Sequence, residues 1–474
     1  MPALLTPSCA AAAWALAFSG ARGGQRTSSA PMLCAAPLDA MERLSDASRS
    51  GEWSTALALL DDLLEQNQVA PEENAKSSPV HPRAFDDAIV ACSRAQPSPQ
   101  WEAALDVLDK MRATGLQPRT YAFNGAISAC SRAGEWRTSM RLLNQMKGSG
   151  VAPDLVTFNA ALHGAQRAGE PQLALNLLTQ MRDRDIAPDG VSYACAIGAC
   201  RRAAQADQAV RLLDEAMADD SIEIAEVLFV DALRACALAG RRELQADRIW
   251  QMALERAAPA SPGVRAYNAR LQERATAKDW RGALELLNAM RAAGVEPDVS
   301  SCAHAARACG RAGASEAAVA LVQRSAADFG IEPTDRMWCS AMQAYGVDGN
   351  WEGALDLLTE LETAGDGPPS VALYGAAMHA LAHGFKVTEL GEERASWQQC
   401  LQLLERMHEA GVQCDVGVYG AALHACQRAG QWQQVYDLLY EMRAKEVTTA
   451  ETLQPFHITL WKRAKKELAQ TEKP

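Results

Sequence analysis

The chain has 474 residues, with 46 Lys and Arg against 58 Asp and Glu, so its formal net charge is −12. Hydrophobic residues make up 48% of it, which excludes an intrinsically disordered chain. This length predicts several domains or a repeat array rather than one compact core. The acidic balance argues against a uniformly nucleic-acid-binding surface, although local cationic stripes remain compatible with it.

The first residues have the composition of a targeting segment. There is no Asp or Glu before Leu38, and Arg22 and Arg26 are the cations. This pattern predicts an organelle transit peptide over residues 1–36, for a plastid in preference to a mitochondrion. Two alternatives stay open: an Ala-rich disordered start, and a secretory signal whose apolar part is residues 11–18. A signal followed by a transit peptide, as a complex plastid requires, would reconcile both features. No run reaches 18 apolar residues, so no membrane span is expected.

The rest of the chain repeats itself. Residues 120–154 read TYAFNGAISACSRAGEWRTSMRLLNQMKGSGVAPD, and residues 155–189 read LVTFNAALHGAQRAGEPQLALNLLTQMRDRDIAPD. Residues 264–298 repeat the pattern, again over 35 residues. This register predicts about eleven units between residues 37 and 450, with starts near 37, 82, 120, 155, 190, 226, 264, 299, 335, 371 and 416. Residues 72–81 form a linker, residues 385–396 an extra loop, and residues 451–474 a capping helix and tail.

Within a unit the apolar pattern is helical twice. In residues 155–189, the first stripe is Phe158, Ala161, Leu162 and Ala165, and the second is Leu173, Ala174, Leu177, Leu178 and Met181. Gly169 separates the two stripes, and Pro188 closes the unit. Each unit is therefore predicted to be a helical hairpin that buries its stripes only by stacking on its neighbours.

Tryptophan and cysteine follow the same period. Seven tryptophans share the seventeenth place of a unit, allowing for insertions: Trp53, Trp101, Trp136, Trp280, Trp351, Trp397 and Trp432. Six cysteines share the eleventh: Cys92, Cys130, Cys200, Cys236, Cys309 and Cys426. We interpret both sets as packing residues, since a free cysteine behaves as a small buried hydrophobe. The chain has no C-x-x-C pair, so no metal site is expected.

These features together resemble the pentatricopeptide repeat family. The resemblance rests on the 35-residue period, the V-T-F-N opening, A-G at the mid-turn, A-L-x-L-L before Met, and the closing P-D. It covers most of residues 37–450 and is strongest in 120–189 and 264–298. The resemblance implies an all-α fold, a right-handed α-solenoid of helix-turn-helix repeats. It also implies binding of single-stranded RNA in organelles, with about one base per repeat.

The resemblance assigns base reading to the fifth and last residues of a unit. The well-formed pairs are Asn124 with Asp154, Asn159 with Asp189, and Asn268 with Asp298. In the family such a pair prefers uridine, so we expect U-containing RNA. Second-position side chains sandwich the bases, and the candidates are Tyr121, Val156, Val191, Val227 and Arg265. The competing interpretation is that these asparagines and aspartates serve as helix caps and turns.

Arginine recurs at the thirteenth place, near the end of each first helix. The residues are Arg49, Arg94, Arg132, Arg167, Arg202, Arg311 and Arg428. Stacked hairpins would align them into a cationic stripe, and the resemblance makes them candidates for phosphate contact. The alternative is that each arginine complements the negative end of its own helix, at about 0.3–1 kcal/mol.

Other units depart from the pattern. Their fifth residues are Met41, Asp86, Ala194, Val230, Ala303, Cys339, Gly375 and Gly420. Because alanine and glycine cannot read a base edge, we expect modest sequence selectivity, and possible protein partners at the narrow, apolar C-terminal units.

No catalytic motif stands out. H-x-E, G-x-x-x-x-G-K-[ST] and G-x-S-x-G do not occur. We therefore expect no enzyme, no cofactor and no small-molecule substrate, but a protein that binds organellar RNA and assists its stability, processing, splicing or translation. The rival hypothesis is a protein-interaction scaffold.

Overall fold

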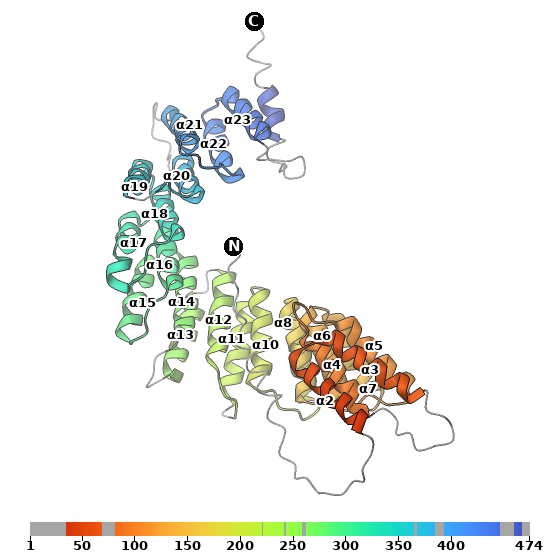
Figure 1. Cartoon of the computed structure of the whole chain (residues 1–474). Coiled ribbons are helices and arrows are strands. Elements are labelled where there is room, and N and C mark those ends of the chain that lie inside the picture. Colours follow the sequence, from red (N-terminus) through yellow and green to blue (C-terminus); the bar gives the residue numbers. More distant parts are fainter. Residues whose placement is uncertain are drawn as a thin grey trace, which may run out of the picture. The chain divides into compact units, whose positions relative to one another are not determined.

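A computed structural model describes residues 35–68, 81–219, 221–240, 243–257, 262–364, 367–383, 393–445 and 459–466. All regular structure in these ranges is helical, which confirms the all-α fold expected from the sequence. The helices fall into two compact units, Met1–Ala235 and Cys236–Pro474, whose boundary lies inside one helix. Each unit is an array of stacked helical hairpins (Figure 1).

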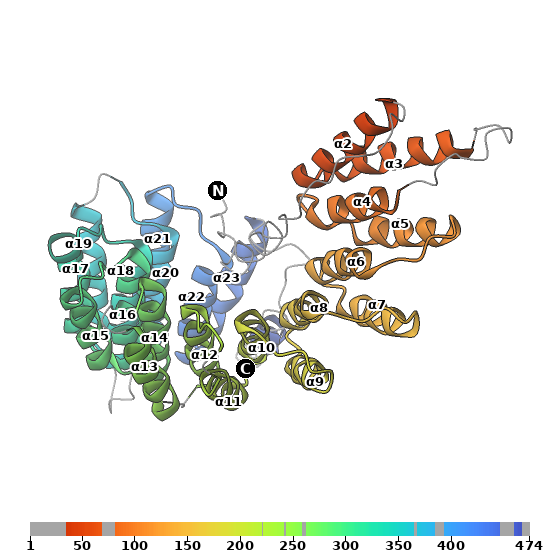
Figure 2. The same cartoon turned by 90° about the horizontal axis from the view of Figure 1, so that it is seen from below.

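In the first unit, the first helices of the first five hairpins pack on one another in turn, and each second helix packs on its own first helix (Figure 2). The first helices are α2 (Ala35–Ser50), α4 (Pro82–Arg94), α6 (Thr120–Ala133), α8 (Leu155–Ala168), α10 (Gly190–Arg202) and α12 (Glu226–Ala239), which crosses the boundary. The second helices are α3 (Trp53–Gln68), α5 (Trp101–Ala113), α7 (Trp136–Gly148), α9 (Pro171–Arg182) and α11 (Ala206–Met217).

The second unit continues the same alternation. It contains α13 (Glu243–Ala257), α14 (Val264–Ala277), α15 (Trp280–Ala292), α16 (Val299–Ala312), α17 (Ser315–Phe329), α18 (Asp335–Asp348), α19 (Trp351–Ala364), α20 (Val371–His383), α21 (Glu393–Glu409), α22 (Val416–Arg428) and α23 (Trp432–Ala444). A further helical segment covers residues 459–466.

The repeat register coincides with the helix starts. From α4 onward, the first helix of each hairpin begins at the residue where the register places a unit start, and α2 begins two residues before residue 37. Of the remaining sequence-based expectations, the transit peptide lies outside the described residues apart from Ala35 and Ala36. The linker lies outside them up to residue 80. The extra loop lies outside them up to residue 392, because α21 begins at Glu393.

Side-chain size decides how closely the hairpins stack. A Cβ atom added at Gly125 of α6 would lie 2.8 Å from the Ile89 side chain of α4, so this pair of helices depends on glycine for its close approach. At the mid-turn of the next hairpin, Gly169 adopts φ +70°, the left-handed conformation that ends α8. Tryptophans begin α3, α5, α7, α15, α19 and α23, where they are partly buried.

The eleventh-place cysteines are all buried and form no disulfide among the described residues. Burial raises the pKa of Cys92 and of Cys130 to about 12, so these thiols stay protonated and pack as small apolar groups. No helix in the described ranges combines the length and the apolar character that a membrane crossing requires.

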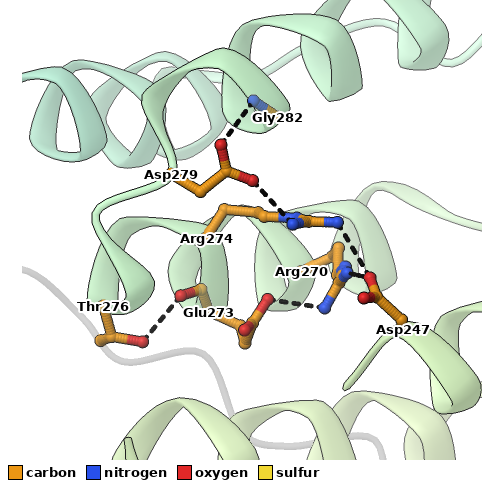
Figure 3. Close-up of polar contacts among 7 residues, drawn as sticks. All are labelled: Asp247, Arg270, Glu273, Arg274, Thr276, Asp279 and Gly282. Carbon is orange, nitrogen blue, oxygen red and sulfur yellow. Dashed lines mark hydrogen bonds and ion pairs between the residues drawn. The ribbon is translucent and has the colours of Figure 1, made fainter. Parts of the chain in front are cut away.

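One hairpin of the second unit breaks the apolar pattern. Arg270 of α14 is 1% exposed and bonds to Asp247 of α13 and to Glu273 Oε2 at 2.6 Å (Figure 3). Arg274 occupies the eleventh place, where other units have cysteine, and bonds to Asp247 Oδ1 at 2.9 Å and Asp279 Oδ2 at 2.6 Å. This ion network links α13, α14 and the start of α15 through polar contacts in place of apolar ones.

Candidate nucleic-acid interface

The first predicted reading pair is hydrogen-bonded across two hairpins. Asn124 lies on α6, and its Nδ2 donates to Asp154 Oδ1 at 3.1 Å. Asp154 is also the N-cap of α8, where its Oδ1 accepts from the Thr157 backbone N–H at 2.8 Å. The Thr157 hydroxyl lies 2.5 Å from Asn124 Oδ1 and accepts from the Asp154 backbone N–H. Amide, carboxylate and hydroxyl therefore form one cluster.

The same cluster occurs at the other two predicted pairs. Asn159 donates to Asp189 at 3.2 Å, and the Ser192 hydroxyl lies 2.6 Å from Asn159 Oδ1. In the second unit, Asn268 donates to Asp298 Oδ1 at 3.1 Å, and the Ser301 hydroxyl lies 2.6 Å from Asn268 Oδ1. Asp189 and Asp298 complete capping boxes with Ser192 and Ser301. The cap role that the sequence offers as the alternative to base reading thus holds for Asp189 and Asp298, which also pair with asparagine.

The hydroxyl fixes how each amide is presented. Because the amide oxygen faces a hydroxyl and one N–H faces a carboxylate, turning the amide over would set its oxygen against the carboxylate oxygen. One N–H and one oxygen lone pair of each amide stay available to a ligand. Asn124 and Asn159 are 6% and 7% exposed, so a ligand reaches them only at their outer edge. The hydroxyl at the third position of the following unit is a contributor that sequence reasoning missed, although its place in a capping box signals it.

The second-position side chains differ in accessibility. Tyr121 and Val156 are 44% and 37% exposed, close to the asparagines that lie three residues further along α6 and α8. Val191 and Val227 are half-buried, and Arg265 is exposed. Tyr121, Val156 and Arg265 therefore offer the larger surfaces for a stacked base.

The thirteenth-place arginines bind the preceding hairpin. Four of them donate to a backbone carbonyl at the end of the previous first helix. The pairs are Arg94 with Ser48 at 3.3 Å, Arg132 with Ser93 at 2.7 Å, Arg202 with Arg167 at 3.1 Å and Arg428 with Ala382 at 2.7 Å. These carbonyls carry the negative end of that helix and lack an intrahelical partner. These four arginines thus bind the helix end of the neighbouring hairpin, and they also lie in the last turn of their own helices, as the alternative interpretation requires.

In the first unit these arginines lie close enough to influence one another. Burial lowers the pKa of Arg132, and the charges of Arg167 and Arg94 lower it further. His163 of α8 is neutral, since burial and the nearby Arg167, Arg132 and Arg202 lower its pKa to about 4. We call Arg94, Arg132, Arg167 and Arg202 the arginine row. It provides a local cationic surface on an acidic protein.

The row does not include Arg428, described above, or two further thirteenth-place arginines, Arg49 and Arg311. Arg49 pairs with Asp46 on its own helix, at 3.0 Å, and both side chains are exposed. Arg311 of the second unit is half-buried, and its charge contributes to lowering the pKa of Arg307.

The C-terminal hairpins have a hollow in place of reading clusters. It measures about 800 Å³ and lies along α18, α20 and α22. Its lining includes the fifth-position residues Cys339 and Gly375, together with Ala376, His379 and Asp415. Small side chains at the fifth position thus remove the amide and leave space.

Comparison with known proteins gives a consistent result. Residues 72–257 match a family model described as the pentacotripeptide-repeat region of PRORP, and residues 336–366 and 417–447 match the PPR repeat model. A curated relative, pentatricopeptide repeat-containing protein 10, chloroplastic, from Zea mays, is 31% identical over 153 residues. That match covers 32% of this chain and 18% of the relative, so the chain spans less than a fifth of the relative's length.

One solved structure supports the same fold, and a second was also matched. The crystal structure of the pentatricopeptide repeat protein PPR10 from maize aligns with a TM-score of 0.55 at 20% identity, covering 98% of this chain and 73% of that one. PPR10 in complex with an 18-nt psaJ RNA element aligns with a TM-score of 0.47, also at 20% identity, covering 98% and 62%. The repeat models cover more than half of the sequence, and the helical hairpins follow their period. The chain belongs to the pentatricopeptide repeat family.

Proposed function

We propose that this protein binds single-stranded RNA in an organelle, without catalysis, and acts there in RNA stability, processing, splicing or translation. The observation that carries the proposal is the amide–carboxylate–hydroxyl cluster, which occurs with the same geometry at Asn124, Asn159 and Asn268. Family membership supports it, because single-stranded RNA is the ligand that the family's repeat architecture implies.

The cluster fits a uracil edge, which carries one N–H donor between two carbonyl acceptors. The free N–H of Asn124 would donate to a uracil carbonyl, while its amide oxygen or the Asp154 carboxylate accepts the uracil N–H. Tyr121 and Val156 would flank the base. The arginine row would attract the phosphates with the guanidinium N–H groups that do not hold the neighbouring helix end.

An RNA titration tests this proposal. The full chain is titrated with labelled single strands that are either U-containing or all-A, at low and moderate salt. We expect tighter binding of the U strand and weaker binding of both strands as salt rises. Replacing Asn124 and Asn159 by Ala should remove the U preference. Replacing Arg132 and Arg167 by Ala should weaken both strands alike and reduce the salt dependence. The absence of binding at micromolar protein would contradict the proposal.

The rival function is a protein-interaction scaffold, and the hollow along α18, α20 and α22 is the feature that favours it. A scaffold predicts that neither the asparagine nor the arginine variants alter any RNA complex. For the location, residues 1–36 fused to a fluorescent protein should reach a plastid in preference to a mitochondrion. The name of the maize relative, which places that protein in the chloroplast, supports this expectation.

A further inference from the structure

The hairpin of residues 82–119 has a different set of groups at its reading position. Its fifth residue is Asp86, its last residue is Arg119, and the third residue of the following unit is Ala122. Asp86 Oδ2 lies 3.9 Å from an Arg119 guanidinium nitrogen. An acceptor on α4 and a donor at the start of α6 therefore replace the amide and carboxylate found in the next two hairpins.

Asp86 has an unmet hydrogen-bonding requirement. Its side chain is 7% exposed, the same as Asn159. In the described part of the chain, Oδ1 of Asp86 is buried and has no hydrogen-bond partner. The equivalent oxygen of Asn124 faces the Thr157 hydroxyl, but Ala122 offers no hydroxyl here. A buried acceptor without a partner is costly, and such an atom calls for a donor from outside the chain.

The surroundings suit a base. Arg119 is exposed over 64% of its side chain, so its remaining N–H groups can meet a ligand. Tyr121, two residues further along, presents 44% of its surface. Burial raises the pKa of the Tyr121 phenol, the charges of Asp87 and Asp86 raise it further, and Arg94 and Arg83 lower it. The acceptor Asp86 and the cation Arg119 are thus paired, and the aromatic side chain of Tyr121 follows Arg119 by two residues.

We propose that this hairpin reads guanine, through the Asp86 carboxylate and the Arg119 guanidinium. The proposal rests on the RNA-binding function proposed above. The Watson–Crick edge of guanine carries two adjacent donors, N1–H and N2–H, beside the acceptor O6. A carboxylate accepts both donors at once, and a guanidinium donates to O6.

The other bases fit this pair less well. Uracil places its one donor between two acceptors, which would face the carboxylate. Cytosine and adenine each offer one amino group beside an unprotonated ring nitrogen, so only one hydrogen bond to Asp86 forms. The pairing of an acceptor at Asp86 with a cation at Arg119 therefore selects guanine over all three.

The test uses the full chain and A-rich 12-mers with a central UU for Asn124 and Asn159 to bind. The nucleotide immediately 5′ or 3′ of UU is varied among G, A, C and U. On one of the two sides, we expect G to bind about tenfold tighter than the other bases. Replacing that G by inosine, which lacks N2–H, should lose most of the gain in the wild-type protein.

Variants on the protein side complete the design. In Asp86→Asn, G and inosine should bind alike, while the preference for UU over AA remains. Asp106→Asn removes an equal charge from the exposed face of α5 and should keep the G preference. A UU preference without a G preference on either side would overturn this proposal alone. Equal discrimination between G and inosine in wild type and Asp86→Asn would also overturn it. Absence of any RNA binding would refute the RNA-binding function as well.

Discussion

The Thr157 hydroxyl offers the sharpest test of how a reading cluster is built. Thr157 is fully buried, and its hydroxyl contacts Asn124 Oδ1 at 2.5 Å, Asp154 Oδ1 at 2.8 Å and the Asp154 backbone N–H at 3.1 Å. Thr157→Val keeps the shape of the side chain and removes these contacts. The variant leaves a backbone N–H at the start of α8 without its capping partner and a buried amide oxygen without its donor.

The expected loss follows from these contacts. A buried polar group left without a partner costs about 1–3 kcal/mol, and loss of a helix cap costs about 1 kcal/mol. Because water reaches the outer edge of the cluster, we expect about 2 kcal/mol in total. Urea unfolding of the full chain, followed by circular dichroism, measures it as a shift in the midpoint of the transition that includes this unit. Thr157→Ser retains the hydroxyl and should keep most of the stability.

RNA binding gives the second readout. Without the hydroxyl, only the bond from Asn124 Nδ2 to Asp154 Oδ1 holds the amide, so uridine discrimination at this site should fall by about tenfold while the salt dependence of binding stays the same. Thr157→Ser should retain the discrimination. If Thr157→Val unfolds like wild type, or if Thr157→Ser loses as much selectivity as Thr157→Val, the hydroxyl does not position the amide and the reasoning is refuted.

Three further predictions concern stability. Burial raises the pKa of Asp86 from 3.8 to about 6, so ionisation of this carboxyl destabilises the folded state as pH rises from 3.8 to 6. Asp86→Asn should therefore stabilise the protein above pH 6 by at most about 3 kcal/mol, with no gain at pH 4, as measured by thermal unfolding. Glu273→Gln should cost about 3 kcal/mol in urea unfolding, because it leaves the buried Arg270 poorly paired, whereas Arg270→Met combined with Glu273→Leu should restore most of that loss. Gly310→Ala should destabilise the protein by about 1–3 kcal/mol, since the new Cβ would lie 2.5 Å from a backbone oxygen of α18. The control Gly420→Ala places its Cβ where nothing lies within 4 Å, so it should stabilise the protein by up to about 1 kcal/mol.

The sequence predicts the hairpins because apolar residues recur with helical spacing in each unit. The stripe that includes Phe158 and Leu162 is followed by a glycine and a second stripe, and this pattern predicts two helices joined by a turn. The pairing of Asn124 with Asp154 is accessible through the resemblance to the pentatricopeptide repeat family, which assigns a common role to the fifth and last residues of a unit. What periodicity does not reveal is the partner of a side chain in the next hairpin.

Two findings depend on that missing information. Arg132 reaches the Ser93 carbonyl of α4 because stacking places the end of one first helix beside the next, a relation set by packing distance and not by the order of residues. Arg270 and Glu273 occupy places that the helical pattern assigns to apolar side chains, and their burial becomes favourable only because Asp247 of the preceding helix completes the network. Both contacts require the three-dimensional neighbour to be known.

The reading site therefore belongs to the boundary between two hairpins, and not to a single hairpin. Asn159 comes from one hairpin, Asp189 closes it, and Ser192 comes from the next, so we expect a change in the third residue of one hairpin to alter the base preference of the hairpin before it. The arginine row follows the same rule, because Arg202 is held by the hairpin that precedes it. An isolated hairpin would possess neither an oriented amide nor an anchored guanidinium. We therefore expect stacking to be required for recognition as well as for stability, and variants that loosen the stack should lose base selectivity before they lose helical structure.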